Sequence, residues 1–204
     1  MNLEKTSGQD WKSEIMALTH TPAPEIGTPC PDFELPSAQG GVVTREQFKG
    51  KNALLIMFIC NHCPYVLAVE DRLLELARGL QKESVGLVAI SANDSERYPE
   101  DSFEKMKSRT VEKNYPFPYL YDETQQVARS FGAVCTPDFF LYDSKMKLAY
   151  RGRLDDSWKD AAAVHSRDLA LAIEALLGGR RPTTDQKSSM GCSIKWKPET
   201  FGQM

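Results

Sequence analysis

The stretch ALLIMFICNHCPYV, residues 53–66, decides the fold. Residues 53–60 form a continuous apolar run of strand length, which is typical of a strand buried on both faces of a sheet. Apolar residues then recur at helical spacing, at Val66, Val69, Leu73, Leu76 and Leu80. The stretch therefore predicts a buried strand that leads directly into an amphipathic helix, with Cys60 and Cys63 at the junction.

Strands and helices alternate along the rest of the chain. Further strands are predicted at 85–91, 117–122, 138–143 and 147–153, and a hairpin within 31–51 that turns at Gly40-Gly41. Helices are predicted after Asp101 and Asp122, where Asp101 with Glu104 and Asp122 with Gln125 match capping pairs, and around 169–177 before two glycines. This order predicts a three-layer α/β sandwich, a central mixed β-sheet flanked by helices.

The chain divides into one domain and two flanking segments. We expect residues 1–25 to form an N-terminal arm, residues 26–180 the α/β domain, and residues 181–204 an extended C-terminal tail. The tail is polar and only weakly periodic. We therefore expect Cys192, which lies within it, to be mobile.

The composition excludes several classes of function. Hydrophobic residues make up 41% of the chain and charged residues 26%, and the net charge is −3. A nucleic-acid-binding protein carries a clustered basic surface, which these mixed charges do not predict. The longest apolar run is too short to cross a bilayer, and the first residues contain no signal-peptide core. We expect a cytoplasmic protein with neither nucleic acid nor a membrane as a partner.

The two cysteines at the junction predict redox chemistry. In a reducing compartment, a pair spaced C-x-x-C indicates redox or metal chemistry more often than a structural disulfide. The N–H groups and dipole of a helix N-terminus stabilise a thiolate, so we expect Cys60 to attack and Cys63 to resolve. His62 and Asn61, between the cysteines, are candidate tuning residues, because a protonated imidazole also favours the thiolate.

Two other interpretations of the pair remain open. The cysteines could be buried structural residues, although the strand-to-helix junction argues against this. They could also bind zinc, but a zinc site needs two further ligands. The remaining candidates are scattered along the chain: His20, His165, Cys135 and Cys192.

A second motif, AVCTPDFFLYD at residues 133–143, precedes another predicted strand. A proline at such a position marks a strand edge or a cis peptide bond, so Thr136 and Pro137 are candidate site residues. Cys135, next to them, and Cys192 are candidate auxiliary thiols, and each could instead be structurally inert. Arg153 is a candidate positive charge near the site.

Together these motifs resemble a known family. CNHCPYV at 60–66, SANDSERYPEDS at 91–102, CTPDFFLYD at 135–143 and GCSIKWKP at 191–198 resemble the thioredoxin-fold superfamily. Within it, the chain is similar to peroxiredoxin-like and TlpA-like thioredoxin-domain proteins related to AhpC/TSA, over roughly residues 26–200. The resemblance implies a thioredoxin-like fold, a cis Pro137 packed against the cysteine pair, and the roles given above to Cys60 and Cys63.

The chain also departs from those families. Peroxiredoxins carry a threonine three residues before the peroxidatic cysteine and an arginine that steadies the peroxide. If Cys63 aligns with that cysteine, Cys60 occupies the threonine position and Pro137 the arginine position. TlpA-like proteins usually carry a glutamate three residues after the second cysteine, where this chain has Val66.

The sequence therefore predicts a thiol-disulfide oxidoreductase that needs no cofactor and no metal. Its partners would be a disulfide substrate and an external thiol reductant. One alternative is a peroxiredoxin-like antioxidant that reduces hydroperoxides through a sulfenic acid. Another is a non-catalytic or zinc-holding module on a thioredoxin scaffold.

Overall fold

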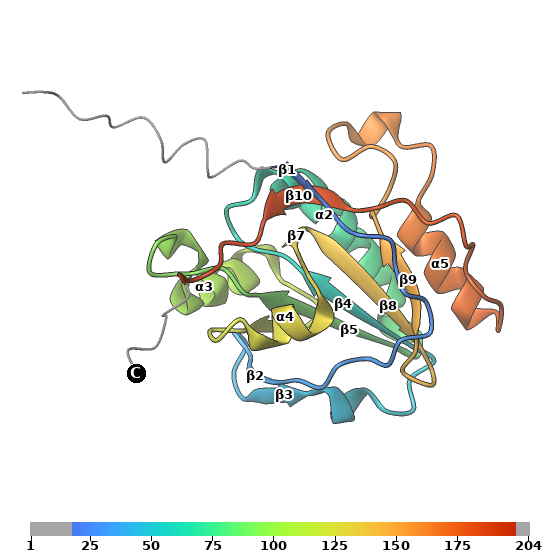
Figure 1. Ribbon diagram of the computed structural model, residues 1–204, viewed down its shortest axis with the longest axis horizontal. Helices are drawn as coiled ribbons and strands as arrows, with labels where there is room; N and C mark the ends of the chain where they lie inside the picture. The colour runs from blue at the N-terminus through green and yellow to red at the C-terminus, as the bar shows by residue number, and fades with distance from the viewer. Residues whose placement is uncertain (1–17, 199–204) are drawn as a thin grey trace, which may run out of the picture.

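The computed structural model describes residues 18–198 of the chain. A five-stranded sheet with the order β6-β5-β4-β8-β9 forms its centre (Figure 1). Its strands are β4 (Ala53–Phe58), β5 (Val85–Ser91), β6 (Tyr119–Tyr121), β8 (Asp138–Asp143) and β9 (Leu148–Gly152). β4, β5 and β6 run parallel, whereas β8 runs antiparallel to both β4 and β9. The predicted mixed sheet is confirmed.

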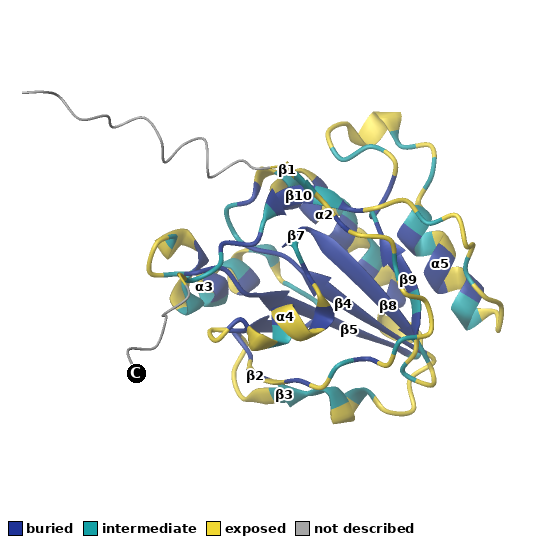
Figure 2. Cartoon of the chain, in the orientation of Figure 1, coloured by how far each residue is buried: buried dark blue, intermediate teal, exposed yellow. Residues whose placement is uncertain are grey.

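Both faces of the sheet are covered, because the side chains of β4 alternate between two cores. Leu55 and Met57 pack in one core, and Leu54 and Ile56 in the other. The helices are α2 (Pro64–Gly79), α3 (Phe103–Lys113), α4 (Gln126–Phe131) and α5 (Asp168–Leu177), with short 3-10 turns η1 (Arg45–Phe48), η2 (Leu80–Lys82), η3 (Pro99–Asp101) and η4 (Ala161–Ala163). Figure 2 shows the central strands buried and the outer sides of the helices exposed.

The helices fall into two layers. α2, α3 and α5 contribute to the first core, through residues such as Leu73, Met106 and Ile173. α4 and the hairpin of β2 (Glu34–Pro36) and β3 (Val42–Thr44) contribute to the second. The fold is thus a thioredoxin-like three-layer sandwich with an N-terminal hairpin, as the sequence predicts.

The C-terminal segment differs from the prediction. A second sheet, of order β1-β10-β7, joins β1 (Leu18–His20), β10 (Met190–Ser193) and β7 (Cys135–Thr136), all antiparallel. β10 lies beside β7 at the upper edge of the molecule in Figure 1. Cys192 is therefore buried in a strand, and the expectation of a mobile thiol is wrong. The polar residues around Cys192 give no sign of a strand, because β10 is held by hydrogen bonds from its backbone to β7 and not by an apolar pattern.

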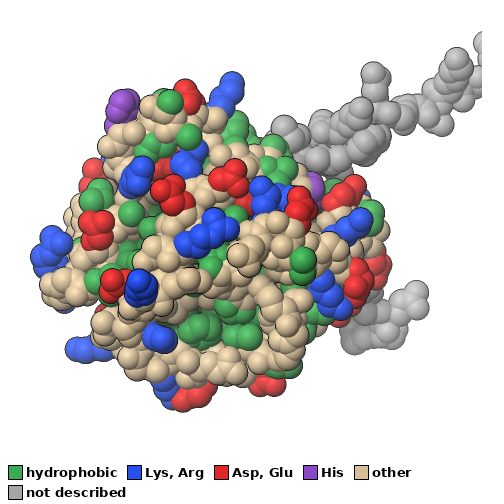
Figure 3. All heavy atoms as spheres, turned by 180° about the vertical axis from the view of Figure 1, so that it is seen from behind, with side chains coloured by type: hydrophobic (Ala, Val, Ile, Leu, Met, Phe, Trp, Pro, Cys, Tyr) green, Lys and Arg blue, Asp and Glu red, His purple; other side chains and the backbone are tan. Residues whose placement is uncertain are grey.

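The first part of the N-terminal arm, residues 1–17, lies outside the described residues. Acidic and basic side chains are interspersed over the face seen in Figure 3, which shows no basic cluster. This agrees with the mixing of positive and negative residues along the sequence. Within residues 18–198, no helix combines the length and apolar character needed to span a membrane.

Candidate functional site

The two cysteines lie where β4 ends and α2 begins. Cys63 is the N-cap of α2, and Pro64 occupies its first turn, where a missing N–H removes no helical hydrogen bond. Cys60 lies in the connection, one turn nearer to the strand. The prediction placed Cys60 at the helix N-terminus, but the structure places Cys63 there. The dipole of α2 therefore favours negative charge on Cys63 more directly.

Thr136 contacts both sulfurs. Cys63 Sγ lies 3.1 Å from the Thr136 carbonyl oxygen, to which the protonated Cys63 thiol donates, and Cys60 Sγ lies 3.4 Å from the Thr136 hydroxyl. The peptide bond between Thr136 and Pro137 is cis, as expected. The structure thus brings together the two motifs that lie more than seventy residues apart in the sequence.

A third thiol belongs to the same cluster. Cys192 lies opposite Thr136 in the pairing of β10 with β7. Its thiol and its backbone both act on Cys63 and lower the pKa of that thiol. Gly191, the preceding residue, allows the close approach: a Cβ there would lie 2.0 Å from the Thr136 carbonyl oxygen.

The thiols share charge unequally. Hydrogen bonds from Cys192 and Cys60 lower the pKa of Cys63 despite its burial. Burial, followed by the hydrogen bond to Cys63, raises the pKa of Cys60 well above its usual value. Burial and the hydrogen bond to Cys63 also raise the pKa of Cys192. These opposite shifts favour Cys63 as the thiol that ionises first in the cluster.

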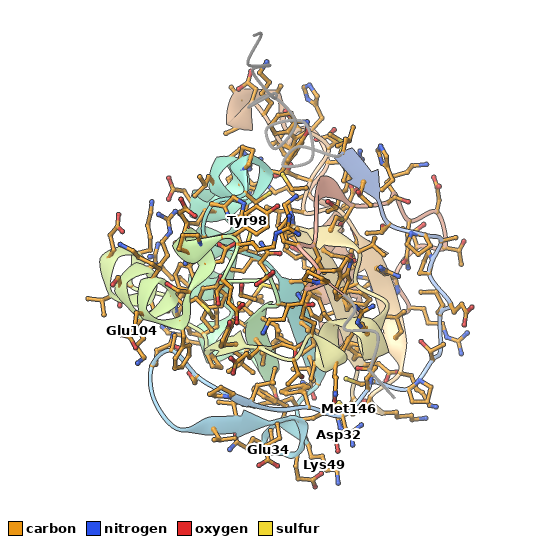
Figure 4. The ribbon with its side chains drawn as sticks, turned by 60° about the vertical axis from the view of Figure 1, so that its left-hand side comes forward. Asp32, Glu34, Lys49, Tyr98, Glu104 and Met146 are labelled. Atoms are coloured by element: carbon orange, nitrogen blue, oxygen red, sulfur yellow. The ribbon has the colours of Figure 1, made fainter. Side chains whose placement is uncertain are left out.

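A buried carboxylate controls the histidine between the cysteines. His62 Nδ1 lies 2.6 Å from Asp101 Oδ2, and this contact raises the pKa of His62 although burial opposes it. A nitrogen of His62 and Cys60 Sγ lie within 4.8 Å of each other. The imidazole ring also stacks on Tyr98, which is labelled in Figure 4. Asp101 thus favours a positive charge on His62, next to the thiol cluster.

Asp101 is the functional residue that sequence reasoning missed. The predicted capping pair with Glu104 is wrong, because α3 begins at Phe103 with Ser102 as its N-cap. The Asp101 carboxylate instead accepts hydrogen bonds from the Asn61 backbone N–H at 2.8 Å and from Asn93 Nδ2 at 2.7 Å. The sequence predicts a helix cap at Asp101 because its spacing from Glu104 matches a capping motif. No local signal in the sequence indicates that it contacts His62 and Asn61.

Asn61 holds the connection between the cysteines in place. Its side-chain amide donates to the Glu100 carbonyl at 2.9 Å, and its side-chain oxygen accepts from the Tyr119 hydroxyl at 3.2 Å. With the backbone bond to Asp101, three hydrogen bonds fix this residue. Asn61 therefore positions the loop and does not point its amide at the sulfurs.

Cys60, His62 and Asp101 also offer metal-ligating atoms within 4.8 Å of one another. A set of Cys, His and Asp would suit zinc by donor type. However, His62 Nδ1 and Asp101 Oδ2 are 2.6 Å apart, whereas two ligands of a tetrahedral zinc stand about 3.3 Å apart at bond lengths of about 2.0 Å. The arrangement therefore fits an ion pair better than a pair of metal ligands.

The other candidate residues lie further from the sulfurs. Cys135 is buried in β7, where burial raises its pKa, and its thiol faces the Pro137 carbonyl at 3.7 Å. Arg153 forms an ion pair with Asp168. It lines a cavity of about 250 Å³ that Pro137, Trp158 and Met190 also border. Arg153 thus borders the same cavity as Pro137, and its guanidinium is paired with the Asp168 carboxylate.

Comparison with known sequences places this site in a family. The profile of the AhpC/TSA family matches residues 26–151, which include the cysteine pair and Thr136-Pro137. The chain belongs to the AhpC/TSA family. This membership indicates a redox function based on cysteine, without deciding between disulfide exchange and peroxide reduction. A search among curated proteins found no match.

Solved structures of similar chains support the fold. The chain is 47% identical to an uncharacterized conserved protein from Geobacillus kaustophilus, with a TM-score of 0.85 over 90% of this chain and 98% of that one. It is 39% identical to a hypothetical protein from Sinorhizobium meliloti 1021, with a TM-score of 0.85 over 88% and 99%. A peroxidoxin from Mycobacterium tuberculosis is 20% identical, with a TM-score of 0.57 over 76% and 97%, and shows the fold alone.

Proposed function

We propose that the chain is a thiol-disulfide oxidoreductase in which Cys60 and Cys63 alternate between a dithiol and a disulfide. The observation that carries the proposal is the coupled pair of thiols at the start of α2. Both sulfurs contact Thr136, and the pair favours one thiolate with a neighbouring thiol. Such a pair can attack a disulfide with one sulfur and release the product with the other.

In the proposed reaction, Cys60 attacks first. Its residue keeps 3% of its surface exposed, whereas Cys63 has none, so an incoming disulfide reaches Cys60 first. The Cys63 thiolate accepts the proton of Cys60 through their hydrogen bond as the Cys60 sulfur bonds to the substrate. One substrate sulfur leaves as a thiolate and takes that proton from Cys63, and Cys60 remains in a mixed disulfide with the other.

Cys63 completes the exchange. As a thiolate again, it attacks the Cys60 sulfur and displaces the second substrate sulfur, which leaves as a thiolate and takes a proton from water, and a Cys60–Cys63 disulfide is formed. The substrate disulfide has then gained two electrons and the pair has lost two. An external thiol reductant restores the dithiol. This cycle requires no cofactor, and we propose a reducing, cytoplasmic setting, in which small thiols can restore the dithiol.

The experiment that tests this proposal compares insulin-disulfide reduction by Cys60→Ser, Cys63→Ser and the wild type, with an excess of a small dithiol. We expect both variants to lose the activity of the wild type. Cys30→Ser is the matched control, because Cys30 is buried in the other core. Full activity in Cys60→Ser would overturn the assignment. About one zinc per chain after purification without chelator would favour the zinc-holding alternative.

A second candidate function, peroxide reduction, is favoured by one observation. Cys63 has a lowered pKa at a helix N-terminus, and the chain belongs to a family whose matched region contains it. Its thiolate would displace water or an alcohol from a hydroperoxide and become a sulfenic acid. Cys60 would then attack that sulfur and release water. The second-order rate of thiol loss to hydrogen peroxide separates the two functions, because disulfide exchange predicts a rate near that of an ordinary thiolate.

A further inference from the structure

Cys63 lies between two thiols, and the proposed cycle uses only one of them. Cys60 lies on one side, in the connection after β4, and its sulfur and that of Cys63 both contact Thr136. Cys192 lies on β10 directly opposite Thr136, in the same core as both cysteines. Both neighbours are protonated where Cys63 is the thiolate, as the opposite directions of their pKa shifts indicate. Cys63 therefore has two neighbouring thiols as candidate disulfide partners.

Cys192 is held in this place by the backbone and not only by its side chain. β10 pairs with β7 on one side and with β1 on the other, and Cys192 takes part in both pairings. Ser189 N–H donates to the Thr21 hydroxyl, and the Ile194 N–H donates to the Val134 carbonyl. The residue is 3% exposed and belongs to the same core as Cys60 and Cys63. Its thiol therefore remains next to Cys63 without any search through solvent.

We infer that Cys192 is a third redox-active thiol, and that Cys63 is the sulfur shared by two alternative disulfides, Cys60–Cys63 and Cys63–Cys192. The inference rests on the proposed function in one respect, since the Cys60–Cys63 disulfide is the product of that cycle. It adds a second oxidised state, in which the C-terminal segment is bonded to the start of α2.

The exchange is balanced within the chain. The Cys192 thiol loses its proton and attacks the Cys63 sulfur of the Cys60–Cys63 disulfide. A bond forms between Cys192 and Cys63, the bond between Cys63 and Cys60 breaks, and Cys60 takes up a proton. No electrons enter or leave the protein in this step. Cys60 is thereby returned to the thiol form while Cys63 remains oxidised.

Disulfide mapping tests the inference directly, because trypsin separates the partners. Cys60 and Cys63 share the peptide 52–72, Cys192 lies in 188–195, and Cys135 lies in 130–145. Native full-length protein is oxidised with diamide, alkylated and digested. Cys60→Ser is the decisive variant, because it leaves Cys192 as the hydrogen-bonded partner of Cys63. We expect loss of both free peptides and their replacement by the linked species 52–72/188–195.

The controls separate this result from unspecific oxidation. Cys63→Ser should leave the peptide 188–195 free, and Cys135→Ser in the Cys60→Ser background should not change the linkage. Wild type that forms Cys60–Cys63 while Cys60→Ser forms no link to 188–195 would overturn the inference and leave the proposed function intact. Wild type that forms no disulfide at Cys63 would overturn the proposed function.

Serine and alanine at position 192 distinguish exchange from hydrogen bonding. Cys192→Ser keeps an O–H donor for Cys63 but cannot form a disulfide, whereas Cys192→Ala removes both. Neither variant can form the 52–72/188–195 link, because 188–195 contains no other cysteine. We expect only Cys192→Ala to raise the pH at which Cys63 is alkylated by iodoacetamide. A Cys192→Ala protein whose Cys63 is alkylated at the wild-type pH would show that Cys192 does not act on Cys63, and would overturn the inference.

Discussion

At the scale of single residues, His62 and Asp101 determine the charge beside the cysteines. The Asp101 carboxylate is fully buried and receives hydrogen bonds from two other groups, so it is held in place next to the imidazole. An anion at this distance stabilises the imidazolium and keeps His62 charged to a higher pH. The charge on His62 thus depends on a residue from another part of the chain.

Asp101→Asn is expected to lower the pKa of His62, because the neutral amide no longer stabilises the imidazolium. In the wild type, the raised pKa of His62 keeps the imidazole positively charged up to a higher pH. In the variant, His62 should lose this charge at a lower pH. The ring-proton NMR shifts of His62 against pH, assigned with a His62→Asn sample, measure this change.

Glu104→Gln is the matched control for that titration, because Glu104 is an exposed carboxylate that pairs with Lys107 on α3 (Figure 4). It should leave the titration of His62 unchanged. An Asp101→Asn protein whose His62 titrates at the wild-type pH would contradict the role given to Asp101.

The sequence predicts part of this site at the residue scale. The spacing of Cys60 and Cys63 and the position of His62 between them indicate a redox pair, because these residues are close in any local structure. Asp101 could not be found in this way. It reaches the site only because β4 and β5 are neighbours in the sheet, which places the segments that follow them side by side.

At the scale of elements, the junctions at the ends of strands build the site. β4 presents Cys60, α2 begins after Cys63, and β7 presents Thr136. The long elements follow from hydrophobic periodicity, so their positions are predictable. β1, β7 and β10 are too short to show alternation, and their pairing joins distant parts of the chain. This is why the sequence predicts the cysteine pair but not the strand beside it.

Gly191→Ala is expected to destabilise the protein. The added Cβ would meet the Thr136 carbonyl oxygen at 2.0 Å and its carbon at 2.7 Å, both of which are backbone atoms that cannot rotate away. Forced contacts of this kind cost about 1–3 kcal/mol of unfolding free energy. Urea unfolding of the reduced protein measures the loss.

Gly79→Ala provides the comparison, because a Cβ at this helical position has no neighbour within 4 Å. It should stabilise the protein by about 0.5–1 kcal/mol, since alanine loses less conformational freedom than glycine in a helix. Equal stability of Gly191→Ala and the wild type would mean that β10 does not press against β7 in solution.

At the scale of the whole molecule, the C-terminal segment connects the two faces of the sheet. Cys192 belongs to the core beneath α2 and α5, whereas Ile194 belongs to the core beneath α4 and the β2-β3 hairpin. Trp196 continues along this second side and lies against Arg129, whose guanidinium is 4.4 Å from its ring. The segment is therefore part of the folded unit, in contrast to the mobile tail expected from its polar composition.

Ile194→Ala is expected to lower the unfolding free energy by about 2–5 kcal/mol, as removal of a buried aliphatic side chain leaves a cavity. Ile194 is only 3% exposed. Leu171→Ala, at a position that is 57% exposed, is the control and should change stability by less than about 0.5 kcal/mol. Similar effects from the two substitutions would show that the segment does not pack in solution as it does in the structure.

The pairing of β1 with β10 has a consequence for the order in which the molecule is made. Thr21 and Ser189 are hydrogen bonded although 168 residues separate them. During synthesis, Cys60, Cys63 and Thr136 all leave the ribosome before Cys192 does. Contacts between such distant residues also carry the largest loop-closure cost. The nascent chain therefore passes through a stage in which Cys60 and Cys63 have left the ribosome but Cys192 has not. Cys192 can take its place beside them only after β10 has been synthesised.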